Sequence, residues 1–157
     1  MKYLLLLILP YIASFFTNLF SKNNLSIYDK IKPVWQPPGF IFGIVWFILY
    51  LFNGLSTVFV LNDNNVKYFY KKITIVLFLL QIFIENLWVF FTNNYVKKVN
   101  NWQLYILIIL NVLILKKVLF FSYINQILPA ILSSFEIIWI LFAISFISYR
   151  IGYFKNI

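Results

Sequence analysis

The chain contains no cysteine and no histidine, and its single methionine is the first residue. The lack of cysteine excludes disulfides and thiolate nucleophiles, and the lack of both residues excludes the usual zinc sites and a histidine-ligated haem. Charge is scarce too, because only 11% of the 157 residues are charged. We therefore predict no catalytic residue, no metal ligand and no resident cofactor.

Apolar side chains are abundant instead. Hydrophobic residues make up 63% of the chain and aromatic residues 22%, and the mean hydropathy is +0.89. A water-soluble domain of this size could not bury that much apolar surface, so the surrounding solvent must be lipid. The net charge of +9 comes from 13 Lys and Arg against 4 Asp and Glu. Such cations usually lie near lipid headgroups, so we expect contact with membrane lipid and no nucleic-acid binding.

Several apolar runs are long enough to cross a bilayer, which takes about 20 residues per helix. Proline, asparagine and lysine fill the connections between the runs, as is typical of loops. The sequence predicts an all-α integral membrane protein, a five-transmembrane-helix bundle that forms one domain over residues 1–157. The predicted helices cover about residues 3–20, 38–61, 73–92, 103–124 and 127–149, and the loop 21–37 is expected to act as a lid.

The first run also has the lysine, apolar core and small residues of a signal peptide. Its apolar character continues through Phe15, Phe16 and Phe20 without an A-x-A site, so we favour a retained helix. Five spans place the two termini on opposite sides of the membrane. Lys and Arg are then shared almost evenly between the sides, with Lys116 and Lys117 counted at the surface, so the positive-inside rule does not orient the chain.

Three of the predicted helices carry polar and aromatic residues along one face, where exposure to lipid would be costly. We expect the three stripes to overlap in depth and to enclose one cavity beneath the loop 21–37. Helix–helix packing is the alternative for each tryptophan, and a protonated carboxyl bonded to a neighbouring helix is the alternative for each glutamate. The stripes are Trp46, Tyr50, Asn53 and Thr57 on the second helix, Glu85, Trp88 and Thr92 on the third, and Glu136, Trp139 and Ala143 on the fifth.

The stretch KPVWQPPGFIFG, residues 32–43, joins the lid to the second helix. Its prolines force the incoming chain to be extended, and a proline suits the first turn of the helix that follows. This arrangement would place Trp35 above the mouth of the cavity. Gly39 and Gly43 form a G-x-x-x-G pattern, from which we expect close packing against another helix of the same bundle.

These residues resemble the signature of the translocator protein family, the tryptophan-rich sensory proteins (TspO). The resemblance is strongest from Lys32 to Ser56, where the spacing is intact, and the helix count and length agree over the whole chain. Glu85 stands where the family has Asn, and Phe135–Glu136 stand where Pro-Tyr is expected. The matching residues are Lys32, Pro33, Trp35, Pro37, Pro38, Phe42, Gly43, Val45, Trp46, Leu49, Tyr50, Gly54 and Ser56.

The resemblance implies a bundle that binds hydrophobic ligands such as porphyrins in an aromatic intramembrane pocket and that commonly forms a homodimer. No sterol site is predicted, because Tyr149-Arg150 lacks a Leu or Val close enough upstream. The positions that match the family's ligand-lining residues are Trp46, Glu85, Trp88, Trp139 and Ala143, and the further candidates are Tyr28, Trp35, Pro37 and Tyr50.

The predicted function is binding of a porphyrin or other tetrapyrrole-like molecule, and the sequence leaves open whether the protein transports or senses it. Lys30 and Lys32 could meet ligand carboxylates at the mouth, or simply lipid headgroups. Two alternatives stay open. One is a small proton-coupled carrier in which Glu85 and Glu136 form a carboxyl switch, and the other is a porphyrin-degrading enzyme that uses Trp46 and Trp139. Enrichment in Lys, Asn and Ile favours a bacterial cytoplasmic membrane over an organelle membrane.

Overall fold

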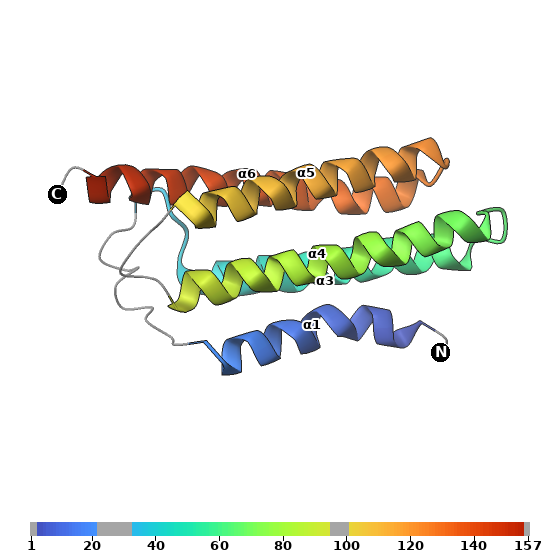
Figure 1. Ribbon diagram of the computed structural model, residues 1–157, viewed down its shortest axis with the longest axis horizontal. Coiled ribbons are helices and arrows are strands. Elements are labelled where there is room, and N and C mark those ends of the chain that lie inside the picture. The colour runs from blue at the N-terminus through green and yellow to red at the C-terminus, as the bar shows by residue number, and fades with distance from the viewer. Residues whose placement is uncertain (1–2, 22–32, 95–100, 156–157) are drawn as a thin grey trace.

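The computed structural model describes residues 3–21, 33–94 and 101–155. Within these ranges the chain forms helices and no strand, which confirms the predicted all-α class. Successive helices run in opposite directions along one elongated bundle (Figure 1). The helices are α1 (Leu4–Leu19), α3 (Gly39–Asn62), α4 (Tyr68–Asn94), α5 (Asn101–Tyr123) and α6 (Ile127–Lys155).

Four helices, α3 to α6, are long and apolar enough to cross a membrane, with mean hydropathies from 2.1 to 2.3. Helix α1 is apolar as well but has 16 residues, which corresponds to a length of about 24 Å. Helix α4 begins at Tyr68 rather than at residue 73, and α6 ends at Lys155 rather than at 149. Both helices extend beyond their apolar runs. At the start of α4 the exposed Lys72 side chain can reach water at the polar interface.

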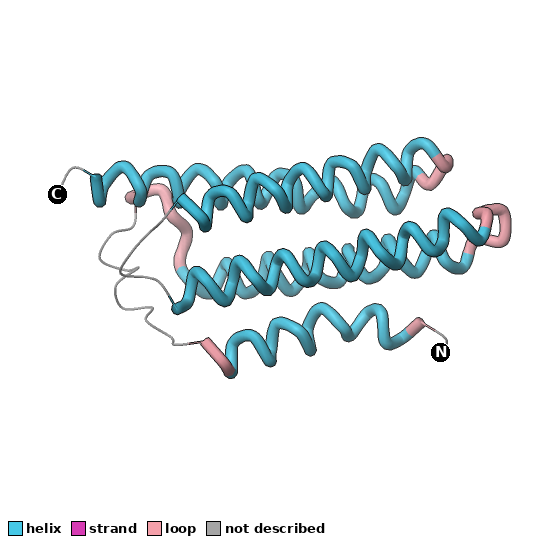
Figure 2. The backbone as a smooth tube through the Cα atoms, in the orientation of Figure 1, coloured by secondary structure: helices cyan, strands magenta, loops and turns pink. Residues whose placement is uncertain are grey.

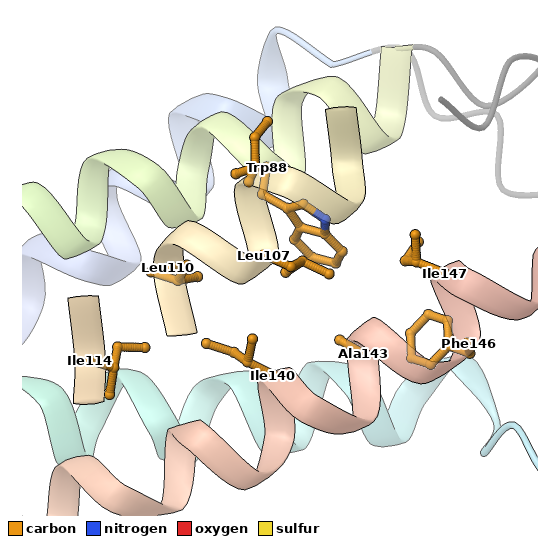
Figure 3. Packing of buried hydrophobic residues seen from close by; sticks show 9 residues of the cluster. Trp88, Leu107, Leu110, Ile114, Ile140, Ala143, Phe146 and Ile147 are labelled. Atoms are coloured by element: carbon orange, nitrogen blue, oxygen red, sulfur yellow. The ribbon is translucent and has the colours of Figure 1, made fainter. Parts of the chain in front are cut away.

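The helices lie in layers. Helix α6 packs along α5 and also against α3, α4 packs on α5 and α3, and α1 covers α3 and α4 from outside (Figures 1 and 2). The main hydrophobic cluster joins α4, α5 and α6, and Figure 3 shows the Trp88 indole directed from α4 toward side chains of the other two helices. Leu107, Leu110 and Ile140 of this cluster are fully buried. This packing positions one flank of the site described below.

Helix α1 approaches α3 closely at Gly54. A Cβ atom at this position would lie 3.1 Å from the Cα atom of Leu7 on α1. The expected close packing at Gly39 and Gly43 is wrong within this chain, because a Cβ atom at either would meet nothing within 4 Å. A G-x-x-x-G pattern permits close approach without requiring it, and here the approach is made at the third glycine of α3.

Side-chain hydrogen bonds also fix α1. The Thr17 hydroxyl donates to the Asn86 Oδ1 atom on α4 at 2.8 Å, and the Tyr11 hydroxyl donates to the Phe47 carbonyl on α3 at 2.8 Å. Because an apolar helix gains little from contact with apolar neighbours in lipid, such bonds and close packing at small residues hold it in place. Helix α1 is thereby held against both helices that it covers.

At one end of the bundle the α3–α4 and α5–α6 connections are tied together at Asp63. The backbone N–H of Asn65 donates to Asp63 Oδ1 at 2.8 Å, and Gln126 Nε2 donates to Asp63 Oδ2 at 2.6 Å. These bonds stabilise the carboxylate and hold the pKa of Asp63 below its ordinary value of 3.8. Asn125, beside Gln126, has a φ of 59°, a left-handed conformation that Asn tolerates well.

The close approach at Gly54 gives a first prediction. Gly54→Leu should lower the free energy of unfolding by about 1–3 kcal/mol, because α1 must move to admit the side chain. Gly43→Leu is the matched control on the same helix and should cause no comparable loss. Thermal unfolding of the purified variants in one detergent measures both. Equal losses at the two positions would contradict the packing described for Gly54.

The Asp63 contacts give a pH prediction. A carboxyl group whose pKa is lowered by folding stabilises the fold above its unfolded-state pKa, and this stabilisation is lost as pH falls through the folded-state pKa. Asp63→Asn should therefore be less stable than the wild type at neutral pH, and the two should converge as the pH falls below the ordinary value of 3.8. Thermal midpoints measured against pH test this, and a difference that persists at the lowest pH would contradict it.

Candidate functional site

A cavity of about 500 Å³ opens between α1, α3, α4 and the C-terminal part of α6. Helix α3 supplies the largest share of its lining, beginning with the residues that directly follow the prolines at 37 and 38. Gly39 and Gly43 leave one wall without side chains, which is why their G-x-x-x-G pattern faces open space rather than a neighbouring helix. The lining residues are Ser14, Asn18, Gln36, Pro37, Gly39, Phe42, Gly43, Trp46, Phe47, Tyr50, Trp88, Val89, Thr92, Phe146, Ile147 and Arg150.

Aromatic rings form the walls of this cavity. The Trp46 and Trp88 rings lie 6.2 Å apart between centroids, and the Trp46 and Tyr50 rings lie 5.5 Å apart. Trp88 is only 8% exposed, and its indole N–H is buried without a hydrogen-bond partner in the described part of the chain. A flat apolar molecule could stack on such rings. The Trp88 N–H is also a donor that a ligand acceptor could satisfy.

The cavity carries a cation, the guanidinium group of Arg150 on α6. Arg150 is 4% exposed, lies over the Phe146 ring at 5.4 Å from its centroid, and donates from Nη2 to Gln36 Oε1 at 3.1 Å. Gln36 precedes α3, so this bond ties the end of the connecting segment to α6. An arginine has five N–H donors and can bind a carboxylate in a bidentate manner while keeping other bonds.

The predicted site residues divide between several places. Pro37, Trp46, Tyr50 and Trp88 line the cavity together. Ala143 is 2% exposed and belongs to the hydrophobic cluster beside Trp88. Tyr28, Lys30 and Lys32 lie outside the described residues.

Trp139 and Trp35, the other two tryptophans of the predicted pocket, do not line the cavity. Trp139 lines a separate groove of about 380 Å³ between α3 and α6, and its ring contacts Phe42 at 5.2 Å between centroids. Phe42 thus separates Trp139 from the cavity. Trp35 is 50% exposed and contacts Phe142 at 5.7 Å between ring centroids. The expected single chamber therefore holds Trp46 and Trp88, while Trp139 faces a second groove.

The two glutamates lie in a polar cluster at the centre of the bundle. Lys117 on α5 is 1% exposed, and its Nζ donates to Asn53 Oδ1 at 2.5 Å and to Gln81 Oε1 at 2.9 Å. Gln81 in turn donates from Nε2 to Glu136 Oε2 at 2.6 Å. Glu85 is 1% exposed and lies next to Glu136. We name these five residues the central polar cluster.

The placement of Lys117 corrects the expectation that it lies at the membrane surface. Its neighbour Lys116 is exposed, whereas Lys117 points into the bundle. Adjacent residues on a helix face directions about 100° apart, so the buried Gln81 and two glutamates attract only one of the two lysines. The signal available in the sequence was a cation inside an apolar run, together with two carboxyl groups that needed a counter-charge.

The structure thus defines a multi-pass integral membrane protein in which an aromatic cavity lies beside a buried, charged cluster. Residues 5–154 match the sequence model of the TspO/MBR family. The chain belongs to this family, as its resemblance to the tryptophan-rich sensory proteins implied. No curated protein matches the chain.

The central polar cluster gives a prediction about stability. Lys117→Met should cost about 1–3 kcal/mol for each buried acceptor that loses its donor, because the Asn53 and Gln81 side-chain oxygens are both left without Lys117. Lys116→Met removes the same charge from an exposed position and should have little effect. Thermal unfolding in detergent compares the two variants, and similar losses for both would show that Lys117 is not buried in this network.

Proposed function

We propose that the protein binds a flat, hydrophobic, tetrapyrrole-like molecule in the cavity lined by Trp46, Tyr50 and Trp88. The observation that carries this proposal is the pairing of two indole rings, 6.2 Å apart between centroids, on the wall of a cavity of about 500 Å³. This volume lies within the range of about 300–1,000 Å³ common to small-molecule sites. Membership of the TspO/MBR family supports the same ligand class.

The guanidinium group of Arg150 in the cavity lining favours a ligand with carboxylate groups. Arg150 is the charged side chain among its described lining residues, and Asn18 and Gln36 add neutral polar groups. The two glutamates do not line the cavity, so they do not place negative charge directly against a ligand there. A porphyrin with propionate groups would therefore lay its ring along the aromatic wall and direct its carboxylates toward Arg150.

The first test is quenching of tryptophan fluorescence by protoporphyrin IX added to the protein in lipid nanodiscs. Trp46→Phe and Trp88→Phe should each weaken binding, because the porphyrin ring has more contact area when it stacks on an indole than on a phenyl ring. Trp102→Phe is the control, since Trp102 is 70% exposed and does not line the cavity. The red shift of the porphyrin Soret band provides a readout that does not depend on the number of tryptophans.

Unchanged affinity in both cavity variants, or an equal loss in Trp102→Phe, would contradict the proposed site. Trp139→Phe distinguishes binding in the cavity from binding in the groove between α3 and α6. Binding that is lost in Trp139→Phe and kept in Trp46→Phe would move the ligand to the groove between α3 and α6.

The role of Arg150 gives a second, sharper test. Arg150→Gln should weaken binding of protoporphyrin IX by about 10-fold or more, in keeping with loss of a hydrogen bond to a charged group worth about 1.5–3 kcal/mol. Binding of the dimethyl ester of the same porphyrin should change little, because the ester has no carboxylate. An equal loss for acid and ester would show that Arg150 acts through the structure of the cavity and not through ligand charge.

A further inference from the structure

The central polar cluster contains more acid than base. Lys117 brings one cation, and Glu85 and Glu136 bring two carboxyl groups, all at 3% exposure or less. The groups that face them from the packed helices are Tyr50 and Asn53 on α3 and Gln81 on α4. From α1, the Tyr11 ring packs against the Tyr50 ring at 5.7 Å between centroids, and its hydroxyl group donates to the Phe47 carbonyl rather than to the cluster. Tyrosines are neutral at ordinary pH, so none of these described neighbours adds a cation to balance the second carboxylate.

A net charge buried in a lipid-spanning bundle is very costly, whereas a neutral, hydrogen-bonded cluster is tolerated. Neutrality with a charged Lys117 requires one proton shared between the two carboxyl groups. Repulsion between like charges leads to the same result, because two neighbouring carboxyl groups are not both ionised at close range and instead share one proton.

The hydrogen bonds indicate which carboxyl group holds the proton. An ammonium group can only donate, so the Gln81 side-chain oxygen must face Lys117 and its nitrogen must donate to Glu136. The distances of 2.5 Å from Lys117 to Asn53 and 2.6 Å from Gln81 to Glu136 are short, as expected where charged groups take part. Glu136 Oε2 is connected to Lys117 through Gln81, whereas Glu136 Oε1 has no partner among the described residues. The negative charge therefore suits Glu136, the carboxyl group connected to the cation, better than Glu85.

Glu85 is placed differently. Both of its carboxyl oxygens are buried and have no hydrogen-bond partner among the described residues, which suits a neutral acid better than an anion. Glu85 lies one helical turn before Trp88, and Asn53 lies one turn after Tyr50, so the cluster adjoins the residues that line the cavity. Tyr50 lines the cavity and lies within electrostatic range of Glu85, so its hydroxyl group is our candidate for a polar route between the two.

We propose that Glu85, Glu136 and Lys117, joined by Gln81 and Asn53, form an intramembrane binding site for one exchangeable proton. The proton resides on Glu85 and exchanges with water through the aromatic cavity by way of Tyr50. Lys117 sets the number of bound protons by balancing one carboxylate. This site does not depend on which molecule the cavity binds.

The composition of the chain makes the site directly measurable, because Glu85 and Glu136 are its only glutamates. Protein labelled with ¹³C at the glutamate δ-carboxyl carbon, in lipid bilayers at pH 7, should show two signals, one protonated and one ionised. Two ionised signals would overturn the proposal, since the cluster would then hold no proton. Two protonated signals would overturn it as well, since Lys117 would then be neutral.

Substitutions test whether charge balance sets the number of protons bound by the cluster. In the Glu85→Gln variant, Glu136 should be ionised. In the Glu136→Gln variant, Glu85 should be ionised. In each case Lys117 balances the single carboxylate that remains. A protonated signal in either variant would contradict charge balance. Lys117→Gln should give two protonated signals and Lys117→Arg one. If Lys117→Gln does not fold, the two glutamate variants and Lys117→Arg still decide the question.

Exchange and ion specificity are tested on the wild type. The infrared C=O stretching band of the protonated carboxyl group should shift after transfer to D₂O and should be absent from Glu85→Gln. A band that does not shift would show a sealed proton and contradict an exchangeable site. Replacing choline chloride with sodium chloride should leave the protonated ¹³C signal unchanged. Its conversion to the ionised form would reassign the site to a metal cation and overturn the proposal.

Discussion

The interaction on which the rest of this structure depends is the burial of the Lys117 ammonium group inside the bundle. Lys117 Nζ is held by Asn53 from α3 and Gln81 from α4, and Gln81 is held by Glu136 from α6. One charged group therefore needs contributions from all four long helices. In a bilayer, apolar contact distinguishes poorly between alternative helix arrangements, whereas a buried cation with fixed partners allows few of them.

The cavity follows from this arrangement. Asn53 and Tyr50 are one turn apart on α3, and Glu85 and Trp88 are one turn apart on α4, so fixing the cluster also fixes how the aromatic residues face each other. The glycines of α3 have two different roles. Gly54 admits α1 at close range, while Gly39 and Gly43 leave the space that Trp46 and Trp88 border. Arg150, bonded to Gln36, places a guanidinium group at that space.

The sequence was sufficient for the fold class, because apolar runs of bilayer length leave a helical bundle as the main solution. Helical periodicity also placed Trp46, Tyr50 and Trp88 on faces that meet at one cavity. Periodicity fails at the next step, because it shows which residues share a face without showing which neighbour that face meets. Trp139 follows Glu136 on one stripe of α6, yet the rotation of α6 puts its ring behind Phe42.

The cations show the same limit. Two adjacent lysines near the end of an apolar run usually reach the headgroups by extending their side chains, and nothing local distinguishes Lys117 from Lys116. The distinction comes from partners on three other helices, which are far away in the sequence. Arg150 stands at the end of the last apolar run, where an interfacial position is the ordinary expectation. Its place in the cavity depends on the segment before α3, which folds back to meet α6.

The most direct test of this account is an experimental structure of the protein in lipid with protoporphyrin IX bound. We expect the ring to lie along Trp46 and Trp88, a carboxylate to face Arg150, and Lys117 to keep its contacts with Asn53 and Gln81 beneath the ligand. A ring seated against Trp139 in the groove between α3 and α6, or a Lys117 side chain that points to the membrane surface, would contradict it.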